Sequence, residues 1–152
     1  MSHWPISKSL LMEILADRIT DCFVTRLVWE RLGYQSAEFS KKVWVAGKKT
    51  PKEWVVTFPE APAVIAERKA AVQLTRSIPK EYKQLLKQEL NFSGYRIGEL
   101  YPRRTRRATA VNWLLAFLAI HGELLPDTGP LPELFSPPMD PIQGHPGDPD
   151  VF

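Results

Sequence analysis

The stretch YPRRTRRATAVNWLLAFLAIHG, residues 101–122, decides the fold of this chain. Its second part is apolar, since over residues 108–120 only Thr109 and Asn112 are polar and neither Gly nor Pro interrupts the run. A helix that is apolar nearly all round is usually the buried centre of a bundle. We therefore predict a long helix that begins at Pro102 and has the rest of the chain packed around it.

Four arginines lie at the start of this stretch: Arg103, Arg104, Arg106 and Arg107. The first turn of a helix carries partial positive charge on its unpaired N–H groups, so cations are unfavourable there. Carboxylates elsewhere in the fold or an anionic partner must offset that cost. Arginine suits both, because its planar fork donates two parallel hydrogen bonds to a carboxylate or a phosphate.

The arginines therefore have two interpretations. In the first, the four form an anion-binding surface that Arg76 and Lys80 enlarge, if the helices of those residues pack alongside. In the second, they pair inside the protein with Glu89, Glu99 or the acidic end of the chain. The sequence alone does not decide whether the arginines point outward.

Charge is divided unevenly along the chain. Residues 1–122 hold all 20 Lys and Arg with 11 of the 17 acidic residues, a net charge of +9, whereas residues 123–152 hold six acids and no Lys or Arg. The second segment also holds eight of the 14 prolines, so it buries too little apolar surface to offset its ordering entropy. We expect a helical domain over 1–122 and a flexible, Pro-rich acidic tail over 123–152, which either stays mobile or folds back on the basic body.

The remaining elements follow from apolar spacing and capping residues. Ser9 is the predicted cap of a first helix, and Thr20 or Asp21 the cap of a second, which ends at Gly33. Polar residues 34–42 indicate a loop. Further helices are predicted over residues 62–74 and 79–90, the latter opened by a proline. The fold class is mainly α, a compact domain of five or six helices around the central apolar helix.

Residues 43–58 leave two alternatives open. β-prone residues flank Gly47–Lys52, so a small hairpin across that segment is possible. Against it, Thr50-Pro51-Lys52-Glu53 is a capping-box pattern with proline at the first helical position. We favour a short helix that begins at Pro51 and ends before Pro59.

Three segments together resemble a known family: residues 74–79 (LTRSIP), 83–87 (KQLLK) and 105–115 (TRRATAVNWLL). The chain resembles small, functionally uncharacterised proteins of oxygenic phototrophs, over roughly residues 10–120. The resemblance implies a soluble protein of a phototroph's cytoplasm, or of the plastid stroma in plant relatives. It carries over no activity, ligand or catalytic residue.

Catalysis has little support in the sequence. His3, His121 and His145 are scattered, and no paired carboxylates, metal-ligand spacing or phosphate-cradling glycines occur. Cys22 adjoins an apolar stripe, which predicts a buried and inert thiol. The longest apolar run has about 13 residues, which is too few to cross a bilayer. We expect no cofactor, no metal and no membrane span.

The leading hypothesis is a non-enzymatic interaction module that binds an acidic partner protein through Arg103, Arg104, Arg106, Arg107, Arg76 and Lys80. The alternative is a low-specificity RNA-binding protein, with affinity that falls steeply as salt rises. Trp44 and Trp54 lie near lysines, but their spacing matches no known RNA-binding signature. An enzyme that acts on an anionic substrate is the third possibility.

Overall fold

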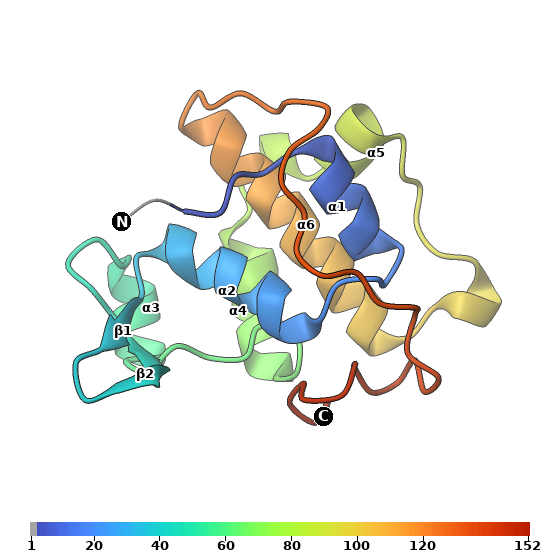
Figure 1. Cartoon of the computed structure of the whole chain (residues 1–152). Coiled ribbons are helices and arrows are strands. Elements are labelled where there is room, and N and C mark those ends of the chain that lie inside the picture. Colours follow the sequence, from blue (N-terminus) through green and yellow to red (C-terminus); the bar gives the residue numbers. More distant parts are fainter. Residues whose placement is uncertain (1–2) are drawn as a thin grey trace.

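The computed structural model describes residues 3–152 and is shown in Figure 1. Its elements follow the chain in the order α1 (Lys8–Leu15), α2 (Asp21–Leu32), β1 (Gln35–Ala37), β2 (Ser40–Val45), α3 (Lys52–Thr57), α4 (Arg68–Ser77), the 3₁₀ turn η1 (Lys80–Tyr82), α5 (Leu85–Leu90), the 3₁₀ turn η2 (Ile97–Glu99) and α6 (Pro102–Ile120). The two strands form a small antiparallel sheet. The predicted mainly α fold with one small hairpin is confirmed.

Helix α6 is the centre of the domain, as its apolar sequence predicts. It crosses the middle of the molecule in Figure 1, and α1, α2, α4 and α5 all pack against it. Val111 and Leu114 are completely buried, and Pro102 occupies the first helical position. Proline is favourable there because the N–H that it lacks would have no helical partner.

The first two helices begin at side-chain caps. Ser7, two residues before the predicted Ser9, caps α1 by accepting a hydrogen bond from the Leu10 N–H at 3.1 Å. Thr20, the first of the two predicted alternatives, caps α2. Gly33 ends α2 as predicted, with φ of 85° in the left-handed region that glycine adopts without strain.

The hairpin lies earlier in the chain than the sequence suggested. Residues 34–42, predicted to be a loop, hold β1 and the first half of β2, and Gln35 pairs with Val45. Buried Tyr34 precedes β1, and its hydroxyl donates a hydrogen bond to the Phe58 main-chain oxygen at 2.8 Å, which ties the start of the hairpin to the end of α3. The β-prone residues 43–45 form the end of β2, but no strand follows the Gly47–Lys52 segment, and the helix favoured from Pro51 is observed as α3.

Residues 79–90 form two short helices, η1 and α5, in place of one continuous helix. Asn112 of α6 separates them: its amide donates to the Tyr82 main-chain oxygen at 3.1 Å, and its side-chain oxygen accepts from the Leu86 N–H at 3.3 Å. Those two main-chain groups are four residues apart, so a continuous helix would have joined them directly. A polar side chain of the central helix therefore replaces one helical hydrogen bond.

Helix α4 starts later than predicted, at Arg68, where the sequence suggested Pro62. The Glu67 carboxylate accepts a hydrogen bond from the Ala63 N–H at 2.7 Å, and the Glu67 N–H bonds the Ala63 oxygen at 2.9 Å. These two bonds close a separate turn ahead of the helix. Val64 in that turn is completely buried.

The segment over 123–152 packs along the body, in contrast to the flexible tail that its composition predicts (Figure 1, orange to red). It contains no helix or strand. Its main-chain oxygens at Pro126 and Asp127 accept hydrogen bonds from the Lys8 and Ser9 N–H groups at 2.9 and 3.0 Å. These N–H groups belong to the first turn of α1 and have no helical partner. Polar main-chain contacts thus hold this part of the tail, and such contacts cannot be predicted from its content of apolar residues.

Candidate functional site

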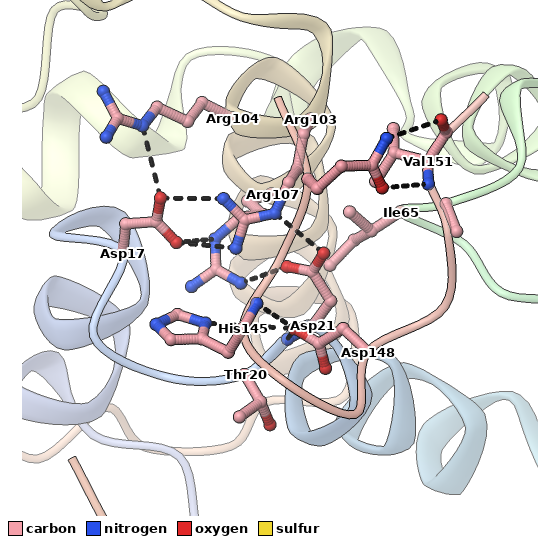
Figure 2. A network of polar contacts seen from close by, with 12 residues as sticks. Asp17, Thr20, Asp21, Ile65, Arg103, Arg104, Arg107, His145, Asp148 and Val151 are labelled. Atoms are coloured by element: carbon pink, nitrogen blue, oxygen red, sulfur yellow. Dashed lines mark hydrogen bonds and ion pairs between the residues drawn. The ribbon is translucent and has the colours of Figure 1, made fainter. Parts of the chain in front are cut away.

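The first predicted site residue, Arg103, is buried in the protein interior. Its two terminal nitrogens donate to the two carboxylate oxygens of Asp17 at 2.8 and 2.7 Å, and its Nε donates to Asp21 at 2.8 Å (Figure 2). Asp17 has a positive φ of 62° in the turn between α1 and α2, and this conformation is uncommon outside glycine. The three side chains form a buried ion cluster between that turn and the start of α6.

Arg107 lies one turn further along α6 and is also completely buried. It donates to Asp21 at 2.6 Å and to the main-chain oxygens of Ile14 and Ile19 at 2.9 and 2.7 Å. Those two carbonyl groups lie at the end of α1 and in the turn that follows it. Arg107 therefore ties the central helix to the α1–α2 connection.

Asp17 and Arg103 keep their charges despite burial. Burial by itself would raise the pKa of Asp17, but the hydrogen bond from Arg103 and the charges of Arg107 and Arg103 hold it below its ordinary value. For Arg103, burial would lower the pKa, but hydrogen bonds to Asp17 and Asp21 raise it. The two aspartates are the carboxylates that offset the unfavourable position of arginines at the start of a helix.

Arg104 is partly buried and also bound within the protein. It donates to Asp17 at 3.3 Å and to the Glu99 main-chain oxygen at 3.1 Å. Its guanidinium carbon lies 6.0 Å from the ring centre of Tyr95 and 5.4 Å from that of Tyr101. Arg104 thus holds the loop that precedes α6 against the helix.

Arg106 binds main-chain oxygens on the opposite side of α6. One terminal nitrogen donates to Ile65, Ala66 and Phe152 at 2.9, 3.1 and 3.1 Å. Burial and the nearby charge of Arg68 both lower the pKa of Arg106. Arg106 therefore joins the turn before α4 to the end of the tail.

The arginine stretch is therefore internally paired, which was the second interpretation of the sequence. An anion-binding surface that includes Arg103 and Arg107 is wrong, because neither side chain reaches solvent. Their partners are Asp17 and Asp21, where the sequence suggested Glu89, Glu99 or the tail. The available signal was the pair of aspartates four residues apart in DRITD, residues 17–21, between two predicted helices.

Three exposed basic residues line a different site, a groove of about 700 Å³ between α3 and α4. Its lining residues are Thr57, Arg68, Lys69, Val72, Gln73 and Arg76. All but Thr57 lie on one face of α4, at spacings of one, three and four residues. The opposite face, with Ala70 and Leu74, is buried in the core. The Gln73 amide donates to the Glu53 main-chain oxygen at 3.3 Å, which holds α3 beside α4.

The cations of this groove are not neutralised within the part of the chain that the structure describes. Arg68, Lys69 and Arg76 are exposed, and no described carboxylate lies within ion-pair distance of them. Lys69 lies 5.8 Å from the ring centre of Phe58. We call Arg68, Lys69 and Arg76, with the other lining residues, the basic groove.

Of the predicted site residues, Arg76 lines the basic groove. Lys80 is also exposed, but it lies in η1, three residues beyond the end of α4. Arg68 and Lys69 were not among the site residues predicted from the sequence. Their signal was the spacing of cations and Val72 along one face of a predicted helix, opposite an alanine-rich face.

A second cavity, of about 320 Å³, lies between the N-terminal segment and α2. Trp4 and Phe23 line it, with their rings edge to face at 5.1 Å. Arg26 and Glu30 also line it and are 3.8 Å apart. Because these opposite charges pair with each other, this cavity shows no preference for a charged ligand.

Two properties hold for all of residues 3–152. No group of three or more His, Cys, Asp or Glu side chains is arranged there to hold a metal ion. Among the same residues, no helix has the length and apolar character needed to cross a membrane. Cys22, predicted to be buried, is exposed at the start of α2.

The fold and these contacts define a mainly α domain in which the α1–α2 turn is fixed by buried arginines of a central helix. Residues 5–119 match the family described as "Domain of unknown function (DUF1823)", and the chain belongs to this family. A solved structure described as a solution NMR structure is 46% identical, with a TM-score of 0.67, over 81% of this chain and 100% of the other. No curated protein matches the chain.

Proposed function

We propose that this chain is a non-enzymatic interaction module that binds an acidic segment of a partner protein in the basic groove. The observation that carries this proposal is the set of three exposed cations, Arg68, Lys69 and Arg76, around a groove with no acidic lining residue. Such a surface attracts anions and steers their approach. Its arginine side chains can bind carboxylates through two parallel hydrogen bonds.

The lining favours a protein segment over RNA. Proteins that bind single-stranded RNA without sequence preference stack bases on aromatic side chains, and none of the groove's lining residues is aromatic. Val72 lines the groove, and Val56 of α3, one residue before lining residue Thr57, is 73% exposed. An acidic peptide with aliphatic side chains would place carboxylates on the cations and apolar groups on these valines.

The same lining favours binding over catalysis. Among its side chains there is no His, Cys, Asp or Glu, the residues that most often transfer protons or act as nucleophiles. Thr57 supplies a hydroxyl without an adjacent base, and a hydroxyl of that kind is a weak nucleophile. The groove therefore offers charge and shape but no reactive group.

We place this module in the cytoplasm of an oxygenic phototroph, or in the plastid stroma of plant relatives. The single cysteine of the chain, Cys22, has no other cysteine with which to form an internal disulfide, which suits a reducing compartment. Fractionation of host cells, with an antibody against the protein, tests this placement. Recovery from an oxidising compartment would contradict it.

Fluorescence anisotropy with a labelled peptide of glutamate, aspartate and leucine tests the proposed binding. The triple variant Arg68→Ala, Lys69→Ala, Arg76→Ala should lose affinity by roughly tenfold or more, because each charge-assisted hydrogen bond is worth about 1.5–3 kcal/mol. The matched control replaces Lys42, Lys48 and Arg96, which are exposed and lie outside the groove lining, and removes the same charge.

The outcomes separate three cases. Loss of peptide binding in the groove variant alone supports the proposal. Equal loss in both variants shows a general effect of net charge and contradicts a specific groove. Tighter binding of labelled polyuridine than of the peptide, with a steep salt dependence, would replace the protein partner with RNA.

A further inference from the structure

The last ten residues of the chain, 143–152, form a docked block at the starts of α2 and α4. Asp148 is its first anchor: its two carboxylate oxygens accept hydrogen bonds from the Asp21 N–H at 2.9 Å and the Cys22 N–H at 3.0 Å (Figure 2). These are the first two N–H groups of α2, which have no helical partner. The carboxylate also accepts from the His145 N–H at 2.9 Å, which closes a turn within the block.

The second anchor of the block is Phe152. Its N–H donates to the Ala66 oxygen at 3.1 Å, and its own oxygen accepts from Arg106 at 3.1 Å. The residue before it, Val151, is held by Gln143 through two hydrogen bonds of 2.8 and 3.3 Å. The block is thus shaped by its own side chains and attached to the domain at two places.

The fit between the block and the domain is close at Gly144. A Cβ atom at that position would lie 2.9 Å from an oxygen of Asp21 and 2.5 Å from one of Asp148. Only glycine therefore allows the block to lie this near to α2. The His145 side chain is buried, with its Nε2 3.2 Å from the Ser136 main-chain oxygen.

The block is separable from the domain beneath it. Between the Phe135 N–H, which bonds the Arg18 oxygen at 2.9 Å, and the block, the chain is largely exposed, with Met139 at 103% and Ile142 at 54%. The domain atoms that hold the block belong to Asp21, Cys22, Ala66 and Arg106. All four residues lie within the family match over 5–119, whereas the block lies outside it.

We propose that the surface from the N-terminus of α2 to Arg106 is a binding site for short acidic peptides, which residues 143–152 fill from within the same chain. The ligand is a peptide in which a glycine precedes an aspartate by four residues. Its last residue is held through main-chain groups alone, since the Phe152 side chain is 77% exposed. A partner segment of this chemistry can exchange with the block. This site does not depend on the basic groove, whose three cations hold none of the block.

Cys22 is a reporter of occupancy. It is the single cysteine of the chain, and its thiol lies 3.7 Å from the Gly147 main-chain oxygen. Although Cys22 is exposed overall, partial desolvation of its thiol, together with the hydrogen bond and charge of Asp148, raises the pKa of Cys22 to about 11. When the block leaves, the pKa falls, more thiolate forms, and the thiol reacts faster with dithiobis(nitrobenzoate) at mildly alkaline pH.

The experiment uses the full chain with Asp148→Ala. Its Cys22 should react roughly tenfold faster than that of the unmodified chain, because the thiolate is the reactive form. Addition of a synthetic peptide with the sequence of residues 143–152 should slow the reaction again in a saturable manner. The same peptide with alanine in place of its first aspartate, which corresponds to Asp148, should not. Asp140→Asn is the control, because Asp140 accepts only from the nearby main chain at Ile142 and Gln143.

A reaction rate unchanged by Asp148→Ala, or slowed equally by both peptides, would overturn the proposal. Should Asp148→Ala fail to fold, the variant Gly144→Ala takes its place. It displaces the block by steric conflict and keeps Asp148 itself unchanged in the sequence. Its Cys22 should then be protected by the same peptide and by that peptide alone. If the peptide of glutamate, aspartate and leucine fails to bind the unmodified chain while Cys22 is still protected, the proposed function is contradicted and this site stands.

Discussion

Arg103 and Asp17 form a two-point ion pair, with donor–acceptor distances of 2.8 and 2.7 Å, and both residues are almost completely buried. The pair joins residues 86 positions apart in the chain. In the interior, the Arg103 guanidinium and the Asp17 carboxylate neutralise each other. Loss of either one leaves the remaining charge buried and unpaired.

Replacement of Arg103 by methionine should therefore destabilise the fold by about 3–5 kcal/mol, the usual effect of removing one partner of a buried ion pair. Urea unfolding followed by circular dichroism measures this loss. The control is Arg26→Met, which removes an arginine that is 62% exposed and pairs with Glu30 on the surface of α2 at 3.8 Å; it should cost about 1 kcal/mol or less. Similar losses in the two variants would show that burial of the pair is not decisive.

The lowered pKa of Asp17 predicts a pH dependence of stability. A carboxyl with a folded-state pKa below its ordinary value of 3.8 contributes stability above that pH and loses it as the pH falls through the lower, folded-state pKa. The difference in unfolding free energy between the unmodified chain and Asp17→Asn should be full at neutral pH. It should shrink as the pH falls below 3.8. A difference in unfolding free energy that grows as the pH falls would show that folding raises the pKa of Asp17 and would contradict the lowered pKa.

Gly33→Ala should destabilise the protein by about 2 kcal/mol, because of left-handed strain and a close contact. The φ of Gly33 is 85°, and a Cβ atom there would lie 2.9 Å from the Thr50 nitrogen. Gly98→Ala is the control, since a Cβ atom at Gly98 has nothing within 4 Å. Thermal melts of the two variants should differ clearly, and equal melting temperatures would contradict the strain at Gly33.

Asn112→Ala should cost about 1–3 kcal/mol, because the Leu86 N–H and the Tyr82 oxygen both lose their partner. Hydrogen exchange should show faster exchange at the Leu86 amide, while amides elsewhere in the core keep their protection. Thr109→Ala is the control, because the half-buried Thr109 hydroxyl bonds the Thr105 oxygen within α6 itself at 3.1 Å; it should leave the Leu86 amide protected. Unaltered exchange at Leu86 in the Asn112 variant would show that another group satisfies that amide.

The parts of the fold that the sequence predicts well are those fixed by local pattern. Helix α6 follows from its uninterrupted apolar run, and α2 follows from Thr20 at its start and Gly33 at its end. Each of these signals acts over a few residues and does not depend on distant contacts. The class of the fold and its central helix were therefore predictable.

What escaped prediction depends on contacts between distant residues. Asn112 divides the 79–90 region into two short helices, although nothing within that region marks the break. The tail binds through main-chain groups, through the Asp148 carboxylate and through Leu125 and Leu134, which pack against the core, so its poor apolar content does not prevent it from packing. The partners of Arg103 and Arg107 lie in a turn that is far away in the chain, and the sequence shows their types but not their proximity.

The docked tail has a consequence for the order of synthesis. Helix α1 leaves the ribosome early, but the oxygens of Pro126 and Asp127 that complete its first turn are made more than 100 residues later. The same delay applies to α2, whose first N–H groups wait for Asp148. A nascent chain that ends with α6 contains the residues of the helical core. The first N–H groups of α1 and α2 are then still open to water. The first turns of both helices are therefore completed by residues that are translated more than 100 positions later.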